Sequence, residues 1–267
     1  MCAQPALKTS GNPGRPQLKP TSAADETFAG VTYHLDGELV PVLTVEIRPD
    51  QPVYFEHHIM LWKNTTVNIG LKSMKGAVKR MFAGLPLFVT EASGEGMIAF
   101  SRDGAGHIVP VHLKAGEGLH VREHQFLAAT NNVEYTFEMA GGVGTMLFGG
   151  TGIFIDKFHC PQGEGILWLH GYGNVFEKTL GPGEQIEVEP GGWLYKDESV
   201  SMEVNLQKLS SGLFGAACGF ITQRFTGPGR VGIQSMYYHP PVAGGEGGRA
   251  GSGGDALGAI AKGLLGG

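Results

Sequence analysis

The chain has 267 residues, of which 42% are hydrophobic and 17% charged, and its formal net charge at pH 7 is −5. This composition is sufficient for a large core in one or two domains, and the negative charge argues against a broad nucleic-acid-binding surface. Three cysteines without a CxxC spacing fit a reducing compartment and predict neither a disulfide framework nor a zinc ribbon. The sequence contains no run of about 20 apolar residues, so no membrane span is predicted.

Residues 1–27 are expected to form a disordered tail. The segment contains four prolines: Pro5, Pro13, Pro16 and Pro20. Its basic, acid-poor composition has some likeness to a mitochondrial transit peptide, but the prolines prevent the amphipathic helix that such a peptide needs. The sequence therefore predicts a cytoplasmic location, with a mitochondrial location as the alternative.

From residue 28 to residue 240 the chain is predicted to be a succession of β-strands. Apolar and polar residues alternate from Val133 to Met139 and from Met202 to Gln207, which is the pattern of a strand with one buried face. Turn-forming glycines and prolines interrupt the chain at intervals too short for long helices. We therefore predict an all-β fold, a β-sandwich or double-stranded β-helix-like body in a single domain.

One basic segment, GLKSMKGAVKRMF at residues 70–82, is predicted to be a short helix. Its four basic side chains are Lys72, Lys75, Lys79 and Arg80. The interleaved apolar residues make the segment amphipathic, which suits contact with an acidic protein, an anionic membrane surface or RNA. The alternative is a solvated helix that covers one end of the body. Nucleic acid is the least favoured partner, because the chain lacks both a positive net charge and an aromatic stacking motif.

An internal repeat of about 67 residues runs through the predicted domain. Similar stretches begin with LKAGEG at Leu113 and LGPGEQ at Leu180, and IRPDQP at Ile47 begins a third stretch at nearly the same spacing before the first. The domain is therefore predicted to contain three related units. The simplest closure of three units places Gly219–Ser235 beside Ile47–Ile69 and gives a pseudo-threefold body.

Each predicted unit has a pair of large apolar residues at the same place. The pairs are Met60-Leu61, Phe126-Leu127 and Trp193-Leu194. Equivalent positions in a repeat have equivalent surroundings when the body is closed. We therefore expect each pair to place at least one side chain in the core.

The turn GPGR at residues 227–230 is a candidate anion site. Gly227 and Gly229 allow close backbone approach, and the guanidinium of Arg230 is suited to phosphate oxygens. A similar phrase, GIFIDKFHCPQGEG, ends one unit earlier at Gly165, so the turn can also be one copy of an architectural motif. In that case Arg230 faces solvent or pairs with an acid, and the glycines are the sensitive positions.

The sequence predicts no catalytic constellation and no metal site. Glu95 and Glu164 fall at equivalent turns of different units, and turn formation accounts for them without an acid–base pair. No ligand set recurs between units among the histidines that were considered: His57, His58, His112, His120 and His124. Nucleotide-binding and nucleophile motifs are also missing from the sequence. We therefore expect no cofactor and no enzymatic activity.

Residues 241–267 are expected to be a glycine-rich linker followed by a short amphipathic segment. Leu257, Ile260 and Leu264 have helical spacing. The glycines between them lower helix stability by about 1 kcal/mol each relative to alanine. The segment is therefore predicted to be only marginally helical on its own.

Several phrases resemble one family in the same order along the chain. They are GGTGIFIDKFHCPQGEGILWLHGYG, LGPGEQIEVEPGGWLYKDESVSMEV and LFGAACGFITQRFTGPGRVGIQS. They look like the signature phrases of the altered inheritance of mitochondria protein 24 family, and the resemblance extends from Phe28 to Tyr238. It implies a fold similar to that of the tryptophan RNA-binding attenuation protein, repeated within the chain. The chain departs from the family at AACGF, residues 216–220, where an acidic glycine-rich turn is usual.

These observations leave two classes of function open. The first is a non-catalytic scaffold or interaction protein of the mitochondrial-biogenesis type, with protein partners or self-association into an oligomer. The second is a β barrel that binds a small ligand, a metal or an anion, with enzymatic activity as one outcome. The missing catalytic constellation favours the first class.

Overall fold

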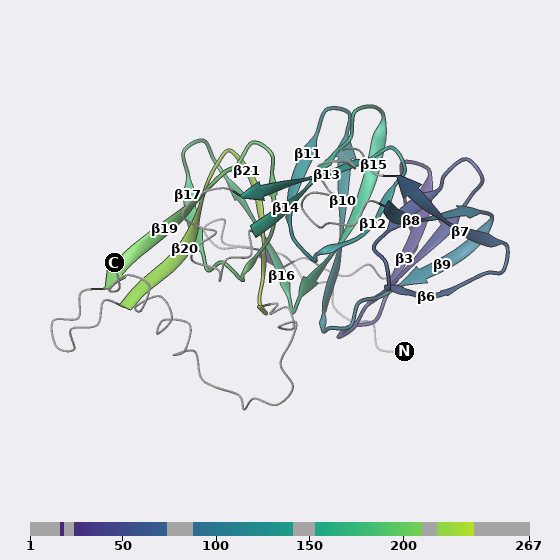
Figure 1. Cartoon of the computed structure of the whole chain (residues 1–267), viewed down its shortest axis with the longest axis horizontal. Helices are drawn as coiled ribbons and strands as arrows, with labels where there is room; N and C mark the ends of the chain where they lie inside the picture. The colour runs from purple at the N-terminus through teal and green to yellow at the C-terminus, as the bar shows by residue number, and fades with distance from the viewer. Residues whose placement is uncertain (1–16, 19–23, 74–87, 141–152, 210–217, 238–267) are drawn as a thin grey trace, which may run out of the picture.

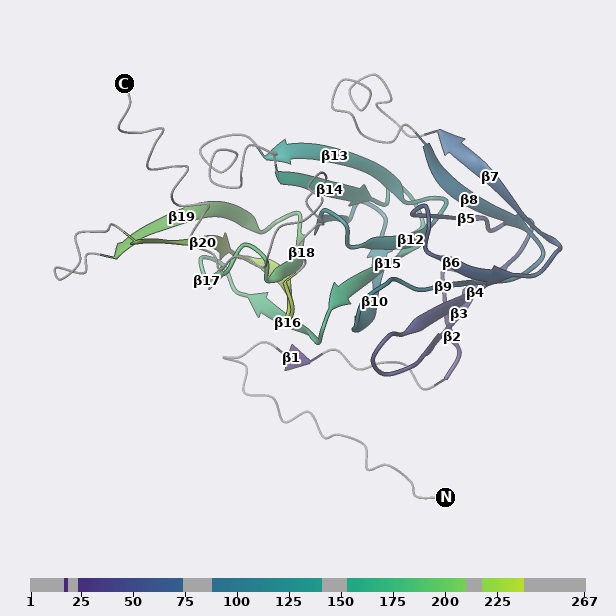
Figure 2. The same ribbon diagram turned by 60° about the horizontal axis from the view of Figure 1, so that its bottom comes forward.

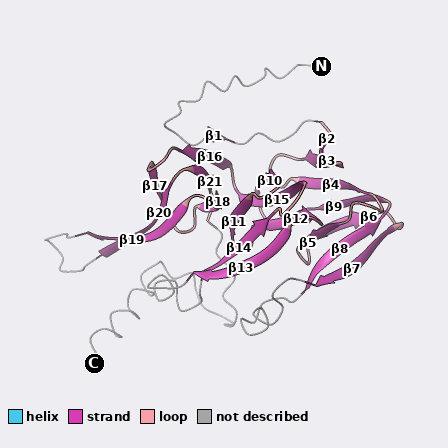
Figure 3. Cartoon of the chain, turned by 90° about the horizontal axis from the view of Figure 1, so that it is seen from above, coloured by secondary structure: helices cyan, strands magenta, loops and turns pink. Residues whose placement is uncertain are grey.

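The structure, a computed structural model, is built entirely from β-strands and loops in the residues that it describes (Figure 3). These residues are 17–18, 24–73, 88–140, 153–209 and 218–237. Every strand pairing among them is antiparallel, and the sheets stack into a sandwich-like body (Figures 1 and 2). The prediction of an all-β fold is confirmed. The described part contains no helix long and apolar enough to cross a bilayer.

Three short strands precede the repeated part of the fold. They are β1 (Gln17–Leu18), β2 (Glu26–Phe28) and β3 (Val31–Asp36). β1 pairs with β16, far along the chain, while β2 and β3 form a hairpin that continues into β4. The N-terminal tail predicted over residues 1–27 therefore contains strand residues at 17–18 and 26–27, because neighbouring strands offer them backbone hydrogen bonds.

The remaining strands fall into three consecutive sets of six. Set 1 is β4 (Val42–Ile47), β5 (Val53–Phe55), β6 (Met60–Lys63), β7 (Val67–Ser73), β8 (Phe88–Gly94) and β9 (Gly96–Phe100). Set 2 is β10 (Gly106–Lys114), β11 (Gly118–Arg122), β12 (Phe126–Thr130), β13 (Glu134–Ala140), β14 (Ile153–His159) and β15 (Glu164–Tyr172). Set 3 is β16 (Val175–Leu180), β17 (Gln185–Val188), β18 (Trp193–Asp197), β19 (Ser201–Leu209), β20 (Cys218–Thr226) and β21 (Gly229–Gln234).

The strands of each set pair in the same way. The first and third strands both pair with the sixth, as β4 and β6 do with β9, β10 and β12 with β15, and β16 and β18 with β21. The second and fourth strands both pair with the fifth. The third strand has a register shift at the same place in every set, next to Met60, Phe126 or Trp193.

Neighbouring sets are joined through one pair of strands. The third strand of set 2, β12, pairs with the second strand of set 1, β5, and β18 of set 3 pairs with β11 of set 2. The register is equivalent at the two joints. Tyr54 lies opposite Ala129 at the first joint, and their counterparts one set further along, His120 and Lys196, lie opposite each other at the second. These joints make one continuous body from the three sets.

The core is divided between the sets in the same manner. Leu127 and Ala128 from β12 pack into the first core cluster beside Val53 and Phe55, which belong to set 1. Leu194 and Tyr195 from β18 pack into the second cluster beside set 2 residues Leu119 and Val121. The third strand of one set therefore completes the core of the set before it. The third cluster, around Trp193 and Phe225, is the smallest of the three, and no following set completes it within the described residues.

The predicted pseudo-threefold closure is wrong. The strands of Gly219–Ser235, β20 and β21, pair with β16 to β19, while those of Ile47–Ile69 pair within set 1 and with β12. Figures 1 and 2 show β19 and β20 at one end of the body and β7 and β8 at the other. The packing at each joint therefore aligns the sets in an open row rather than turning them back to meet.

The short basic helix predicted for residues 70–82 is also wrong where the structure describes it. Residues 70–73 belong to β7, which pairs with β8 along its length, from Val67 opposite Gly94 to Ser73 opposite Phe88. Pairing with a neighbouring strand outweighs the moderate helix propensity of this run. Residues 74–82 lie outside the described residues.

Candidate functional site

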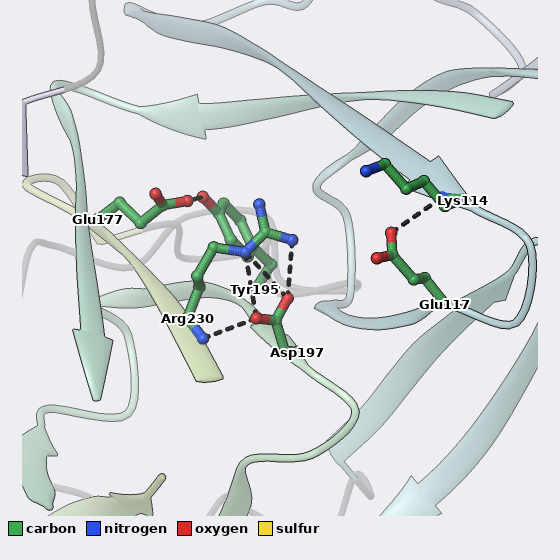
Figure 4. Close-up of polar contacts among 6 residues, drawn as sticks. All are labelled: Lys114, Glu117, Glu177, Tyr195, Asp197 and Arg230. Carbon is green, nitrogen blue, oxygen red and sulfur yellow. Dashed lines mark hydrogen bonds and ion pairs between the residues drawn. The ribbon is translucent and has the colours of Figure 1, made fainter. Parts of the chain in front are cut away.

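Arg230 is paired with an acid inside the chain. Its guanidinium donates from Nε to both carboxylate oxygens of Asp197, at 3.1 and 3.2 Å, and from Nη2 to Oδ1 at 2.9 Å (Figure 4). The backbone N–H of Arg230 donates to Oδ2 of Asp197 at 2.7 Å. Burial lowers the pKa of Arg230, but the hydrogen bond and the charge of Asp197 raise it by more. Asp197 therefore takes the backbone N–H and two side-chain donors of Arg230, and its carboxylate offsets the positive charge that would attract an anion.

The link from Asp197 to the backbone of Arg230 has counterparts in the other two sets. Asn64 Oδ1 accepts from the N–H of Met97 at 2.7 Å, and Thr130 Oγ1 accepts from the N–H of Ile166 at 3.0 Å. In all three cases a polar side chain at or just after the end of the third strand holds the beginning of the sixth strand. This recurrence favours an architectural role for the Asp197–Arg230 contact. Anion binding at this turn stays a prediction.

The glycines of the GPGR turn lie in confined positions. Gly229 has φ of +137°, and a Cβ there would lie 2.7 Å from Cγ2 of Val200 and 2.8 Å from Oγ of Ser199. A Cβ on Gly227 would lie 2.4 Å from the carbonyl oxygen of Gly181. A side chain at either position therefore collides with its neighbours, and at Gly229 it also requires an unfavourable backbone conformation.

A hollow of about 620 Å³ lies beside Arg230. Its lining comes from two loop regions and the β21 end: His112 to Lys114, Gly116 to Gly118, Asp197 to Ser199, and Arg230. Glu117 accepts a hydrogen bond from the N–H of Lys114 at 2.9 Å (Figure 4). Glu184 accepts the equivalent bond from the N–H of Gly181 at 2.9 Å in the next set. The lining has three carboxylates, Glu117, Asp197 and Glu198, and two cations, Lys114 and Arg230, so the hollow has no surplus of positive charge for an anion.

Tyr195 and Glu177 form a second polar contact near Arg230 (Figure 4). The Tyr195 hydroxyl donates to Glu177, and the ring is buried in the second core cluster. Burial, followed by the charge of Glu177, holds the pKa of Tyr195 well above its ordinary value. The hydroxyl therefore stays protonated at neutral pH and serves as a fixed hydrogen-bond donor.

The basic segment provides only one described side chain, Lys72 on β7. Its ammonium group donates to the carbonyl oxygen of Asn131 at 3.1 Å and lies 4.3 Å from the centre of the Tyr54 ring. Burial lowers the pKa of Lys72, and the charges of Glu91 and Glu134 oppose that effect. Lys72 therefore connects β7 to set 2. Lys75, Lys79 and Arg80 lie outside the described residues, so the proposed patch stays a prediction.

The histidines considered in the sequence are dispersed through the fold. His112 stacks on Phe28 with ring centroids 3.8 Å apart, and His57 contacts His58 at 3.9 Å. Burial, followed by the charges of Lys196 and Lys157, lowers the pKa of His120 to about 4. Within the described ranges, no three His, Cys, Asp or Glu side chains gather in a way that could hold a metal ion.

Sequence reasoning missed a concentration of exposed apolar side chains on set 1. Of the eleven large apolar side chains exposed in the described residues, six lie on β6, β7 and β9. They are Met60, Leu61, Trp62, Ile69, Leu71 and Met97. The repeat was the signal that could have found the three on β6, because a row of three sets leaves one third strand without a preceding set.

The fold and the site define an all-β protein made from three joined strand sets, with polar residues of the hollow beside Arg230 engaged in structural contacts. The family model for mitochondrial biogenesis AIM24 matches residues 33–236, and the chain belongs to this family. A crystal structure of a Streptococcus pyogenes protein has the same fold, with a TM-score of 0.60, 20% sequence identity, and coverage of 78% of this chain and 94% of that chain. No curated protein matches the sequence.

Proposed function

We propose that the protein is a non-catalytic scaffold or interaction protein that acts through protein partners. The observation that carries this proposal is the set of exposed apolar side chains on β6, β7 and β9. Groups of exposed large apolar side chains often mark interaction sites. Leu71 is 72% exposed and Leu61 is 55% exposed, although each lies on a strand of a well-packed set.

The polar groups support the same proposal. Arg230, Asp197, Glu117 and Glu184 are used in contacts that hold turns and strand ends. A catalytic acid or base must be available to a substrate proton within hydrogen-bond reach. These groups have structural partners instead. Membership of the AIM24 family agrees with a role in mitochondrial biogenesis, with the cytoplasm as the alternative location for this chain.

The second candidate is a small-ligand or anion site in the hollow beside Arg230. Its volume of about 620 Å³ is within the range of ligand pockets, which favours this alternative. A ligand would have to compete with Asp197 for the guanidinium, or bind through Lys114 and the loop backbone.

A metal analysis and a thermal-shift screen separate the two candidates. The purified full-length protein is melted with inorganic phosphate, ATP, NAD and divalent metals in turn, each in excess. A ligand that binds only the native state raises the melting temperature as its concentration exceeds Kd. We expect no stoichiometric metal and no shift from these ligands. A rise with one ligand class that disappears in Arg230→Ala would support the second candidate and contradict the first.

A further inference from the structure

Two edge strands of this protein have counterparts that are paired elsewhere in the same chain. β6 is the edge of the sheet β2-β3-β4-β9-β6, and β17 is the edge of the sheet β17-β20-β19. The strands equivalent to β6, which are β12 and β18, each pair with the second strand of the preceding set. The strands equivalent to β17, which are β5 and β11, each receive the third strand of the following set. In the described part of the chain, β6 and β17 have no such partner.

We propose that β6 of one copy pairs antiparallel with β17 of a second copy, so that the protein self-associates through the joint that already links its own sets. The proposal deepens the interaction role proposed above by naming a second copy of this chain as the partner. The described residues of one chain cannot make this contact internally, because set 1 and set 3 are at opposite ends of the row (Figures 1 and 2).

The exposure of β6 is the first argument. Met60, Leu61 and Trp62 are 40%, 55% and 45% exposed. Their counterparts on β12 are 4%, 0% and 0% exposed, and those on β18 are 1%, 0% and 0% exposed. These positions of the third strand are therefore buried where a preceding set covers them and exposed to solvent on β6, where none does. A second copy that presents the second strand and core of a set would cover β6 in the same way.

The small core of set 3 is the second argument. Ile186 on β17 is half-buried, whereas its counterparts Leu119 and Val53 are fully buried. In sets 1 and 2 the incoming third strand adds Leu127 or Leu194 to this part of the core. The third cluster receives no such residue within the described chain. Leu61 of a second copy occupies the equivalent position on β6 and has the same side chain.

The register of the internal joints predicts the register between copies. Phe55 lies opposite Ala128 at one joint, and Val121 lies opposite Tyr195 at the other. The equivalent residues on the two free edges are Val188 and Trp62. The next pair along the strands is Glu187 of one copy opposite Lys63 of the other. Directly opposed residues of opposite charge stabilise antiparallel pairing, so the charges favour this register.

The edges formed by the fourth strands do not show the same contrast between sets. The fourth strands β7, β13 and β19 are sheet edges in all three sets. The fourth strand is therefore an exposed edge in every set, whereas β6 and β17 are exposed edges only because they lie at the two ends of the row. An interface between unlike edges is heterologous, so it gives an open chain of copies or a closed ring. Val204, on the constant edge β19, supplies a matched control.

The first test measures the mass of the full-length protein by light scattering over a concentration series. We expect the wild type to form species larger than the monomer, as a ring of fixed mass or as chains that grow with concentration. Trp62→Glu should raise the dissociation constant by about tenfold or more, as expected for loss of a large apolar anchor. Val204→Glu changes an apolar residue of similar exposure, 39% against 45% for Trp62, to the same charge and should leave the wild-type mass unchanged.

The second test exchanges the charges of the predicted pair. Lys63→Glu places a carboxylate opposite Glu187 of the next copy, and Glu187→Lys places an ammonium group opposite Lys63. Each variant alone should associate more weakly than the wild type. An equimolar mixture should recover association, because every contact between unlike copies then joins opposite charges. Glu187→Gln is the control, since it removes the charge that faces Arg224, whose Nη2 donates to Oε1 at 2.7 Å, without adding a positive charge.

Three results would overturn the proposal. One is a monomer at every concentration up to about 100 μM, a range that includes weak specific interfaces. Another is an oligomer whose mass is unaffected by both Trp62→Glu and the charge reversals. The last is an oligomer sensitive to Trp62→Glu and insensitive to Glu187→Lys, which would give β6 a different partner. A ligand shift in the thermal screen, by contrast, would overturn the proposed non-catalytic role without any effect on these masses.

Discussion

Asp197 is the residue on which the GPGR turn depends, because its carboxylate accepts both the backbone N–H and the guanidinium of Arg230. Its side chain is 21% exposed and that of Arg230 is 36% exposed, so solvent weakens the ion pair. The backbone contact is independent of the side chain at position 230. The turn is therefore expected to tolerate loss of the guanidinium better than loss of its glycine.

We predict the order of destabilisation at this turn to be Gly229→Val, then Asp197→Ala, then Arg230→Ala. Gly229→Val should lower the free energy of unfolding by about 2 kcal/mol or more, because it combines a positive φ with a collision against Val200. Arg230→Ala should lower it by about 1 kcal/mol or less. Urea denaturation of the variants measures the order, and a larger loss for Arg230→Ala than for Gly229→Val would contradict the architectural role.

His170 provides a prediction about acid stability. Burial, followed by the charge of Arg102, lowers the pKa of this fully buried histidine from 6.5 to about 4. The unfolded chain therefore binds more protons than the native state between these two values, and stability falls as the pH falls through them. At pH 4 the loss due to this residue is about 3 kcal/mol relative to neutral pH.

We expect His170→Phe to reduce this acid-induced loss, measured as the difference in unfolding free energy between pH 7 and pH 4.5. His159→Gln changes an exposed histidine and is the control that should retain the wild-type difference. Equal pH dependence in all three proteins would show that His170 does not titrate with a lowered pKa.

At the scale of the strand, equivalent positions have different energetic importance according to the set they belong to. Trp193 on β18 is 1% exposed and contacts Phe225 with ring centroids 5.8 Å apart. Its counterpart on β6 is Met60, which is 40% exposed. The expectation that all three apolar pairs are buried is confirmed for Phe126-Leu127 and Trp193-Leu194 and wrong for Met60-Leu61, because β6 has no preceding set.

This difference predicts unequal costs for truncation. Trp193→Ala should lower the unfolding free energy by about 3–5 kcal/mol, which is usual for removing a buried aromatic side chain. Met60→Ala should lower it by less than about 1 kcal/mol, measured in dilute protein so that self-association does not contribute. The measurement is a pair of denaturant titrations. Similar costs at the two positions would mean that β6 is covered by part of the chain itself.

The strands themselves could be predicted from sequence, because the alternation of apolar and polar residues is a local property. It is visible in stretches such as Val133–Met139. The segment at 70–82 could not be assigned this way. Its residues have adequate helix propensity, and its strand form at 70–73 depends on pairing with β8, which the local sequence does not encode. The pairing of Arg230 with Asp197 was foreseen only as contact with some acid, because the partner lies 33 residues away.

For the whole molecule, the regular spacing of similar phrases predicts similar stretches of chain but no angle between them. Closure depends on strand twist and on side-chain packing at the joints β5–β12 and β11–β18. These quantities cannot be obtained from the repeat length. The open row that results has two unlike ends, and the exposure of the apolar residues of β6 at one end is a consequence of that openness.

Hydrogen exchange tests the consequence of the open row at each end separately. If copies join through β6 and β17, the outward-facing amides of these two strands should exchange more slowly as protein concentration rises, because they become hydrogen-bonded between copies. The edge strands β7 and β19 should exchange at a rate independent of concentration. In Trp62→Glu the slowing should disappear from both β6 and β17, although the substitution lies in only one of them. Slowing confined to β6 would contradict a heterologous joint, since the second strand of the pair must be protected to the same extent as the first.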